Sequence, residues 1–121
     1  MTIDEQMASI ANELISKYGK NYKTSLREIC EHMEERFGTN SRSVIPSDYC
    51  YNRVNKGINF DKKPRLFLFL GNGEYECIGE DYKFNGAVYT CERGTNTEVE
   101  VGYWKDGVLS KNKNWELYNL K

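Results

Sequence analysis

The first forty residues carry the hydrophobic spacing of two amphipathic helices. Apolar side chains recur every three or four positions over residues 3–18, and a second stripe runs over residues 26–37. Ser25 and Glu28 are the residue types of a capping box at the start of the second stripe. Gly19 and Gly38 stand where the two patterns stop, as glycine does at helix ends. We therefore expect helices over residues 3–18 and 25–37.

The segment Ser43–Gly57 also has the signals of a helix. It opens with three residue types that favour a first helical turn, Pro46, Ser47 and Asp48. Gly57 is a natural stop. The pattern predicts a third, short helix capped by Asp48 with help from Ser47. So short a helix needs tertiary packing, so we expect Cys50 and one of Tyr49 and Tyr51, which would point to opposite sides, to be buried.

Beyond Gly57 the repeat changes from helical to strand-like. Two runs of strand length, Leu66–Leu70 and Glu74–Ile78, flank the turn Gly71-Asn72-Gly73, which predicts a β-hairpin. Residues 87–91 and 97–104 predict a second hairpin, in which apolar and polar positions alternate on the second strand. Asp106-Gly107 is a further turn signal before Val108 and Leu109.

These elements predict one α+β domain over residues 1–121, with a helical part over 1–57 and an antiparallel β part over 58–121. Three N-terminal helices followed by β-hairpins is the order of a winged helix-turn-helix, with residues 66–78 as the wing. The bridge of about seven residues before the third helix is longer than the three or four of a tight helix-turn-helix.

Charge is unevenly distributed along the chain. The net formal charge is −1, but residues 41–66 carry +4, whereas residues 1–40 carry −2 and residues 67–121 carry −3. A small domain can bind phosphates through one basic patch without a high overall charge. The alternative interpretation is a solvated loop that happens to contain lysines.

The sequence has no strong catalytic or metal-binding motif. Its four cysteines include no closely spaced pair, which favours free thiols over disulfides or a metal site built from distant residues. His32 is the single histidine and lies among glutamates, so we expect neither an enzyme nor a metal or other cofactor. The chain shows no apolar run of membrane-spanning length and no signal peptide, so we expect no membrane partner and a cytoplasmic location.

The run Ser43–Arg53, with Asn55 and Gly57 after it, resembles an uncharacterised bacterial and phage domain often found beside HNH-type restriction endonuclease modules. Its marker is Pro-Ser-Asp-Tyr-Cys-Tyr-Asn-Arg over residues 46–53, and the resemblance continues through residues 66–79. It implies DNA-related work in target recognition or defence. The chain lacks the HNH nuclease residues, so the resemblance implies no cleavage activity.

These observations favour a DNA-binding module whose third helix contacts the duplex. Asn52, Arg53 and Asn55 are types that read base edges, and Tyr51 is the aromatic residue that we place beside them. The candidates for phosphate contacts are Arg42, Lys56, Lys62, Lys63 and Arg65. The alternative is a small protein-interaction factor, such as a phage-encoded modulator of a host defence protein, that binds no nucleic acid. A small-ligand binder is a third interpretation.

Overall fold

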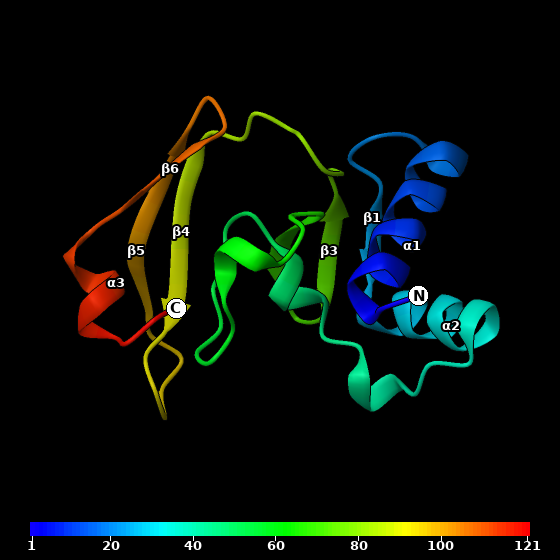
Figure 1. Ribbon diagram of the computed structural model, residues 1–121, viewed down its shortest axis with the longest axis horizontal. Helices are drawn as coiled ribbons and strands as arrows, with labels where there is room; N and C mark the ends of the chain where they lie inside the picture. The colour runs from blue at the N-terminus through cyan, green and yellow to red at the C-terminus, as the bar shows by residue number, and fades with distance from the viewer.

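The computed structural model describes residues 1–121 and contains two three-stranded antiparallel sheets (Figure 1). The first sheet has the order β1-β3-β2 and the second has the order β4-β5-β6. The strands are β1 (Lys23–Ser25), β2 (Phe67–Gly71), β3 (Glu74–Cys77), β4 (Gly86–Cys91), β5 (Glu98–Lys105) and β6 (Val108–Lys111). The α-helices are α1 (Ile3–Tyr18), α2 (Leu26–Phe37) and α3 (Lys113–Leu117). Short 3₁₀ helices occur at η1 (Ser41–Ser43), η2 (Pro46–Tyr49) and η3 (Phe60–Lys62).

The two helices expected from the N-terminal stripes are confirmed. A capping box between Thr2 and Glu5 starts α1, which ends at Gly19. Ser25 starts α2, because its hydroxyl accepts from the Glu28 amide at 3.1 Å. The Glu28 carboxylate does not complete a capping box and instead accepts from the hydroxyls of Thr24 and Tyr22.

The first sheet packs with α1 and α2 around the larger of two hydrophobic clusters. In Figure 1 both helices lie beside β1 and β3, at the blue end of the chain. Met7, Ile29 and Phe67 come from three different elements and are fully buried in this cluster. The predicted β2–β3 hairpin is confirmed, and its turn residues Gly71, Asn72 and Gly73 all have positive φ, which explains the glycines and asparagine found there.

The second sheet packs against a second, smaller hydrophobic cluster. Val88 of β4, Val101 of β5 and Trp115 of α3 are buried together. The predicted hairpin between β4 and β5 is confirmed, as is the turn that leads into β6. The sequence did not indicate α3, whose five residues are too few to show a helical repeat.

The expected third helix is wrong. Only Pro46–Tyr49 form a 3₁₀ helix, and the chain then continues through bends at Tyr51 and Asn52 without further helix. This stretch makes isolated parallel bridges on both sides, between Cys50 and Phe67 and between Arg53 and Tyr89. Without the third helix, the structure lacks the element on which the winged helix-turn-helix prediction depends. What remains of the predicted fold class is an α+β domain with antiparallel hairpins.

The division into a helical part and a β part at residue 57 also needs correction. The short strand β1 lies before α2 and pairs antiparallel with β3, and α3 lies near the C-terminus. Helices and strands are therefore interleaved along the chain. No helix is long and apolar enough to cross a bilayer.

Phe67 and Leu70 provide a matched test of the first core, because they lie on the same strand. Phe67 is fully buried, whereas Leu70 is 44% exposed. We expect Phe67→Ala to lower the free energy of unfolding by about 3–5 kcal/mol, through lost burial and the cavity left behind. Leu70→Ala should change it by less than about 1 kcal/mol. Urea denaturation followed by circular dichroism measures both, and equal losses would contradict this description of the core.

Candidate functional site at the sheet junction

Residues Asp48–Val54, here called the junction segment, connect the two sheets. On one side the Tyr51 amide donates to the Phe67 carbonyl at 2.9 Å, so the segment adds to the edge of β2. On the other side the Tyr89 amide donates to the Asn52 carbonyl and the Val54 amide to the Tyr89 carbonyl, both at 3.0 Å. The segment therefore bridges β2 and β4 without forming a regular strand. It contains three of the residues that the sequence analysis selected for nucleic-acid contact.

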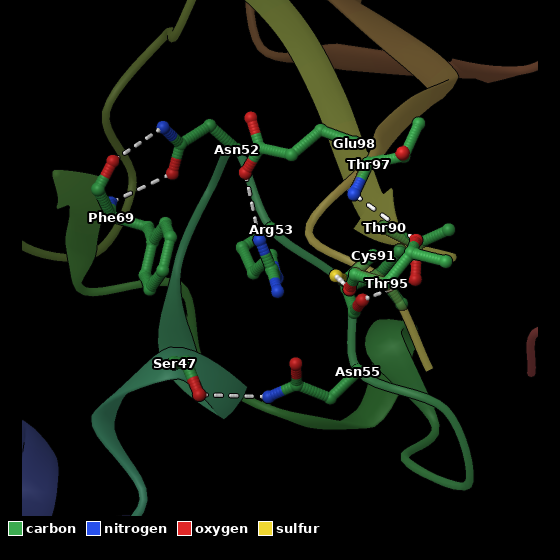
Figure 2. Close-up of polar contacts among 11 residues, drawn as sticks. Ser47, Asn52, Arg53, Asn55, Phe69, Thr90, Cys91, Thr95, Thr97 and Glu98 are labelled. Carbon is green, nitrogen blue, oxygen red and sulfur yellow. Dashed lines mark hydrogen bonds and ion pairs between the residues drawn. The ribbon is translucent and has the colours of Figure 1, made fainter. Parts of the chain in front are cut away.

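Asn52 is committed to the first sheet by its side chain. The Nδ2 group donates to the Phe69 carbonyl at 3.0 Å, and Oδ1 accepts from the Phe69 amide at 2.8 Å (Figure 2). This pair copies the two hydrogen bonds of a backbone strand partner. Because the Asn52 carbonyl bonds to Tyr89, one residue connects both sheets. Its side chain is not free to read a base edge.

Arg53 lies between the two sheets and is mostly buried. Its Nη1 donates to Oε1 of Glu98 at 2.9 Å, and its guanidinium carbon lies 4.6 Å from the centre of the Phe69 ring (Figure 2). Its Nε is buried without a hydrogen-bond partner. A buried unpaired donor is uncommon in native proteins, which makes Arg53 a residue under an unusual constraint.

Tyr51 and Asn55 also have internal partners. The buried Tyr51 hydroxyl donates to the Gly79 carbonyl at 2.7 Å, and the Tyr51 carbonyl accepts from the Trp104 indole at 2.7 Å. Asn55 donates to Ser47 and Asp48, both at 2.8 Å. The predicted cap by Asp48 is wrong, since η2 has no side-chain cap.

The buried residues of this segment agree with part of what the sequence predicted. Cys50 is buried as expected, but Tyr49 and Tyr51 are both buried rather than one of them. Burial raises the pKa of the Cys50 thiol well above its ordinary range, so this thiol is not a reactive nucleophile. A segment enclosed between two sheets can bury successive residues, which a single helix face cannot do.

Lys63 and Arg65 are held against the protein. Lys63 Nζ lies 2.8 Å from Oδ1 of Asp4, at the start of α1. Arg65 donates to the carbonyls of Asp48, Cys50 and Lys63. Its guanidinium carbon also lies 4.0 Å from the centre of the Phe60 ring. Burial lowers the pKa of Arg65 to about 10, so it stays charged at neutral pH.

Three of the predicted phosphate contacts are exposed and make no ion pair. They are Arg42 in η1, Lys56 just after the junction segment, and Lys62 in η3. Lys56 lines a small recess of about 130 Å³ together with Arg93 and two residues of β4. The structure thus leaves these three basic residues accessible and commits Tyr51, Asn52, Arg53, Asn55, Lys63 and Arg65 to internal contacts.

A second recess opens where the two sheets meet, and we call it the junction recess. Its volume is about 360 Å³. Its walls come from both sheets and from the segment between them: Asn52, Phe69, Leu70, Gly71, Tyr89 and Glu98. Arg53 supports two of these walls, because it stacks on Phe69 and pairs with Glu98. The recess thus combines aromatic surface with a carboxylate held in place.

Tyr89 continues from this recess onto an open surface, the outer face of the second sheet. Tyr89 is 36% exposed and Tyr103 on the neighbouring strand is 50% exposed. Ala87 pairs with Tyr103, and Tyr89 pairs with Glu100, so the two tyrosines are close on adjacent strands. The helix α3 packs on the opposite face of this sheet, where Trp115 is buried with Val88 and Val101.

The sequence analysis missed Phe69, Tyr89, Glu98 and Tyr103 as candidate residues. Alternation over residues 98–103 puts Tyr103 on the same side of the strand as Val101, whereas the structure buries Val101 and exposes Tyr103. A bulge between Val88 and Tyr89 shifts the register by one residue, and period-two reasoning cannot detect it. The contacts of Phe69 and Glu98 with Arg53 span 16 and 45 positions, so no local pattern could indicate them.

Metal chemistry has no visible site here. No group of three or more histidine, cysteine, aspartate or glutamate side chains is arranged to hold a metal ion.

Asn52→Ala tests whether this side chain holds the junction together. The substitution leaves the amide and carbonyl of Phe69 without partners, which should lower the free energy of unfolding by about 1–3 kcal/mol. Asn96→Ala, in the exposed β4–β5 turn, is the control and should change it by less than about 0.5 kcal/mol. Urea titration gives both values. A neutral Asn52→Ala would show that backbone hydrogen bonds alone hold the junction.

The Lys63–Asp4 pair predicts a pH dependence. Burial raises the pKa of Asp4, but hydrogen bonds from Lys63 and Tyr49 together outweigh it and leave the pKa below its usual value. The stabilisation is therefore present above the unfolded-state pKa of about 3.9 and is lost as the pH falls through the folded-state value.

We expect Asp4→Asn to be less stable than the parent protein at pH 7, by less than about 1 kcal/mol because the pair is partly exposed. The difference should shrink at pH 3. Asp106→Asn, in an exposed turn, should show no such trend. Urea unfolding at the two pH values measures this, and a constant difference would refute a charge effect.

Comparison with known proteins identifies the family but not the function. The chain is 39% identical over 110 residues to the "Uncharacterized protein YnaC" of Bacillus subtilis (strain 168), an alignment that covers 91% of this chain and 39% of YnaC. The chain thus spans well under half the length of that relative. No solved structure gives a significant match. Residues 2–111 match the family described as "Domain of unknown function (DUF7225)", and the chain belongs to this family.

Proposed function

We propose that this domain is a nucleic-acid-binding module that holds unpaired DNA bases against the outer face of its second sheet. The observation that carries the proposal is the pair of exposed tyrosines, Tyr89 and Tyr103, on adjacent strands of one open face. Every base has a flat π face, so an aromatic side chain on an open sheet is a stacking platform for bases of any sequence. Its setting in restriction, defence or phage biology rests on the resemblance of residues 43–53.

The junction recess, which Tyr89 also lines, has the size and lining to hold one base beside this aromatic face. Phe69, Leu70 and Tyr89 provide apolar and aromatic walls. Glu98 uses Oε1 to accept from Arg53, and Oε2 has no protein partner. A free carboxylate oxygen accepts hydrogen bonds from the amino group of a base, as acidic residues do with cytosine. A base turned out of its stack is recognised by this combination of stacking and edge contacts.

Phosphate contacts come from the basic side chains that remain accessible. Lys56 and Arg93 share the small recess beside β4, the strand that carries Tyr89. Lys105 lies two residues beyond Tyr103 on β5 and therefore points to the same face. Glu100, opposite Tyr89, is an exposed negative charge that opposes phosphate binding. This mode uses a sheet face, so it does not require the helix that the structure lacks.

A protein-interaction module is the second candidate. Val108 and Leu117 are among the most exposed large apolar side chains of the molecule, at 67% and 71%. Val108 pairs with Lys105 and therefore lies on the same outer face as Tyr103. An apolar addition to an aromatic face also suits a protein partner.

Tyr89→Ala tests the stacking proposal. We expect the parent protein to bind fluorescent single-stranded DNA more tightly than the matching duplex, and Tyr89→Ala to weaken single-strand binding by about 1–3 kcal/mol. Tyr82→Ala removes a tyrosine of similar exposure, 44% against 36% for Tyr89, outside this face and should have no effect. Fluorescence anisotropy at two salt concentrations gives the affinities.

Glu100→Gln is a second variant for the same experiment, and it should increase the affinity for single-stranded DNA. It removes a negative charge from the face, so single-strand binding should strengthen at low salt and the gain should fade at high salt. Absence of binding at low salt, or equal binding by the parent and Tyr89→Ala, would overturn the proposal. In that case the protein-interaction candidate takes first place.

A further inference from the structure

A third recess, which we call the aromatic recess, lies beside residues 79–85, which lead from the first sheet to the second. Its volume is about 220 Å³. Three aromatic rings line it, from three different parts of the chain: Tyr51, Tyr82 and Trp104. It has no lining residue in common with the junction recess. The two are neighbours along the chain, because Tyr51 lines one and Asn52 lines the other.

The Tyr51 ring makes edge-on contacts with the other two rings. Tyr51 meets Tyr82 at 77° and Trp104 at 68°, with ring centres 6.4 Å and 5.8 Å apart. Tyr51 is fixed at the bottom, because its hydroxyl donates to the Gly79 carbonyl and accepts from the Tyr82 amide. Trp104 is fixed by its indole bond to the Tyr51 carbonyl. Tyr82 is 44% exposed and forms the outer wall.

Two carboxylates complete the lining. Glu80 and Asp81 both line the recess, and neither makes an ion pair or a side-chain hydrogen bond.

Arg65 is the one positive charge in the lining, and its donors are occupied by backbone carbonyls. Three of its donor nitrogens bond to the carbonyls of Lys63, Cys50 and Asp48. With Glu80 and Asp81 the lining carries a net formal charge of −1, and the nearby Asp48 side chain further offsets the guanidinium. The recess thus presents aromatic faces and negative charge together.

We propose that the aromatic recess binds an alkylammonium group. A cation over an aromatic face is attracted by the ring quadrupole, and a cage of several rings is how proteins recognise methylated or quaternary ammonium ligands. The molecule itself shows this chemistry at Tyr82, where Lys20 Nζ lies 5.3 Å from the ring centre. Lys20 does not line the recess, so it leaves the cage open.

The source of the ammonium group is either a free small molecule or a methylated lysine side chain of another protein. Both present the same chemistry to the rings. The proposal is independent of nucleic-acid binding, because it uses Tyr82 and the two carboxylates rather than Tyr89 and Tyr103. The two proposals therefore succeed or fail separately.

The test compares choline with 3,3-dimethylbutan-1-ol, which has the same shape without the charge. Binding is followed by NMR chemical shifts of the amides of residues 80–82 and of the Trp104 indole. We expect saturable binding of choline and at least roughly tenfold weaker binding of the neutral alcohol. A peptide containing trimethyllysine, against the same peptide with unmodified lysine, then distinguishes a protein source from a free ligand.

Variants locate the binding to this recess. Tyr82→Ala should weaken choline binding roughly tenfold, and Tyr82→Phe should retain it, because the ring provides the attraction. Glu80→Gln with Asp81→Asn should weaken it and reduce its dependence on salt. Tyr89→Ala is the matched control and should have no effect. Equal binding of choline and the neutral alcohol, no saturable binding of choline, or unchanged binding by Tyr82→Ala would overturn the proposal.

Discussion

The whole arrangement depends on the junction segment, which is hydrogen-bonded to β2 on one side and to β4 on the other. Each sheet has its own hydrophobic cluster, so the segment is what turns two small packed units into one structure. Asn52 concentrates this role in a single residue, with its side chain on Phe69 and its carbonyl on Tyr89. Backbone groups at the edge of a sheet must find partners when water is excluded, and an asparagine amide supplies both a donor and an acceptor.

The sequence predicted the elements whose signals are local. The caps of α1 and α2, and the turn between β2 and β3, could be read from a few adjacent residues. The junction could not, because Pro46, Ser47 and Asp48 favour a helical turn that in fact stops after one turn of 3₁₀ helix. The residues that follow are held by partners 17 to 53 positions away, such as Phe69 and Trp104. A pattern of residue types cannot distinguish an asparagine that reads a base from one that holds a strand.

The basic segment, residues 41–66, uses part of its charge in ion pairs with the rest of the chain. Its positive charge lies between two acidic stretches of chain, and its cations pair with carboxylates on both. Lys63 bonds to Asp4 in the N-terminal part, and Arg53 bonds to Glu98 in the C-terminal part. In the reverse sense, Lys111 of the C-terminal part pairs with Asp61, an acidic residue inside the basic segment. Much of the charge asymmetry that suggested a phosphate-binding face therefore serves attraction between parts of the same chain, and the remaining exposed cations are fewer than the sequence indicated.

The position of the junction segment in the chain also orders the events of folding. The helices and the three hairpin turns close over short stretches of chain, whereas the Trp104 indole must reach Tyr51 across 53 positions, and the Thr90 hydroxyl must reach Val54 across 36. Closing long loops costs entropy before the contacts that reward it exist, so such contacts form slowly. The junction segment can bond to β2 early, but it completes its hydrogen bonds only after β4 has been synthesised. Until then Tyr51 and Val54, whose packing partners include Trp104 and Val88, are exposed apolar surface, which makes the unfinished chain more prone to association than the finished domain.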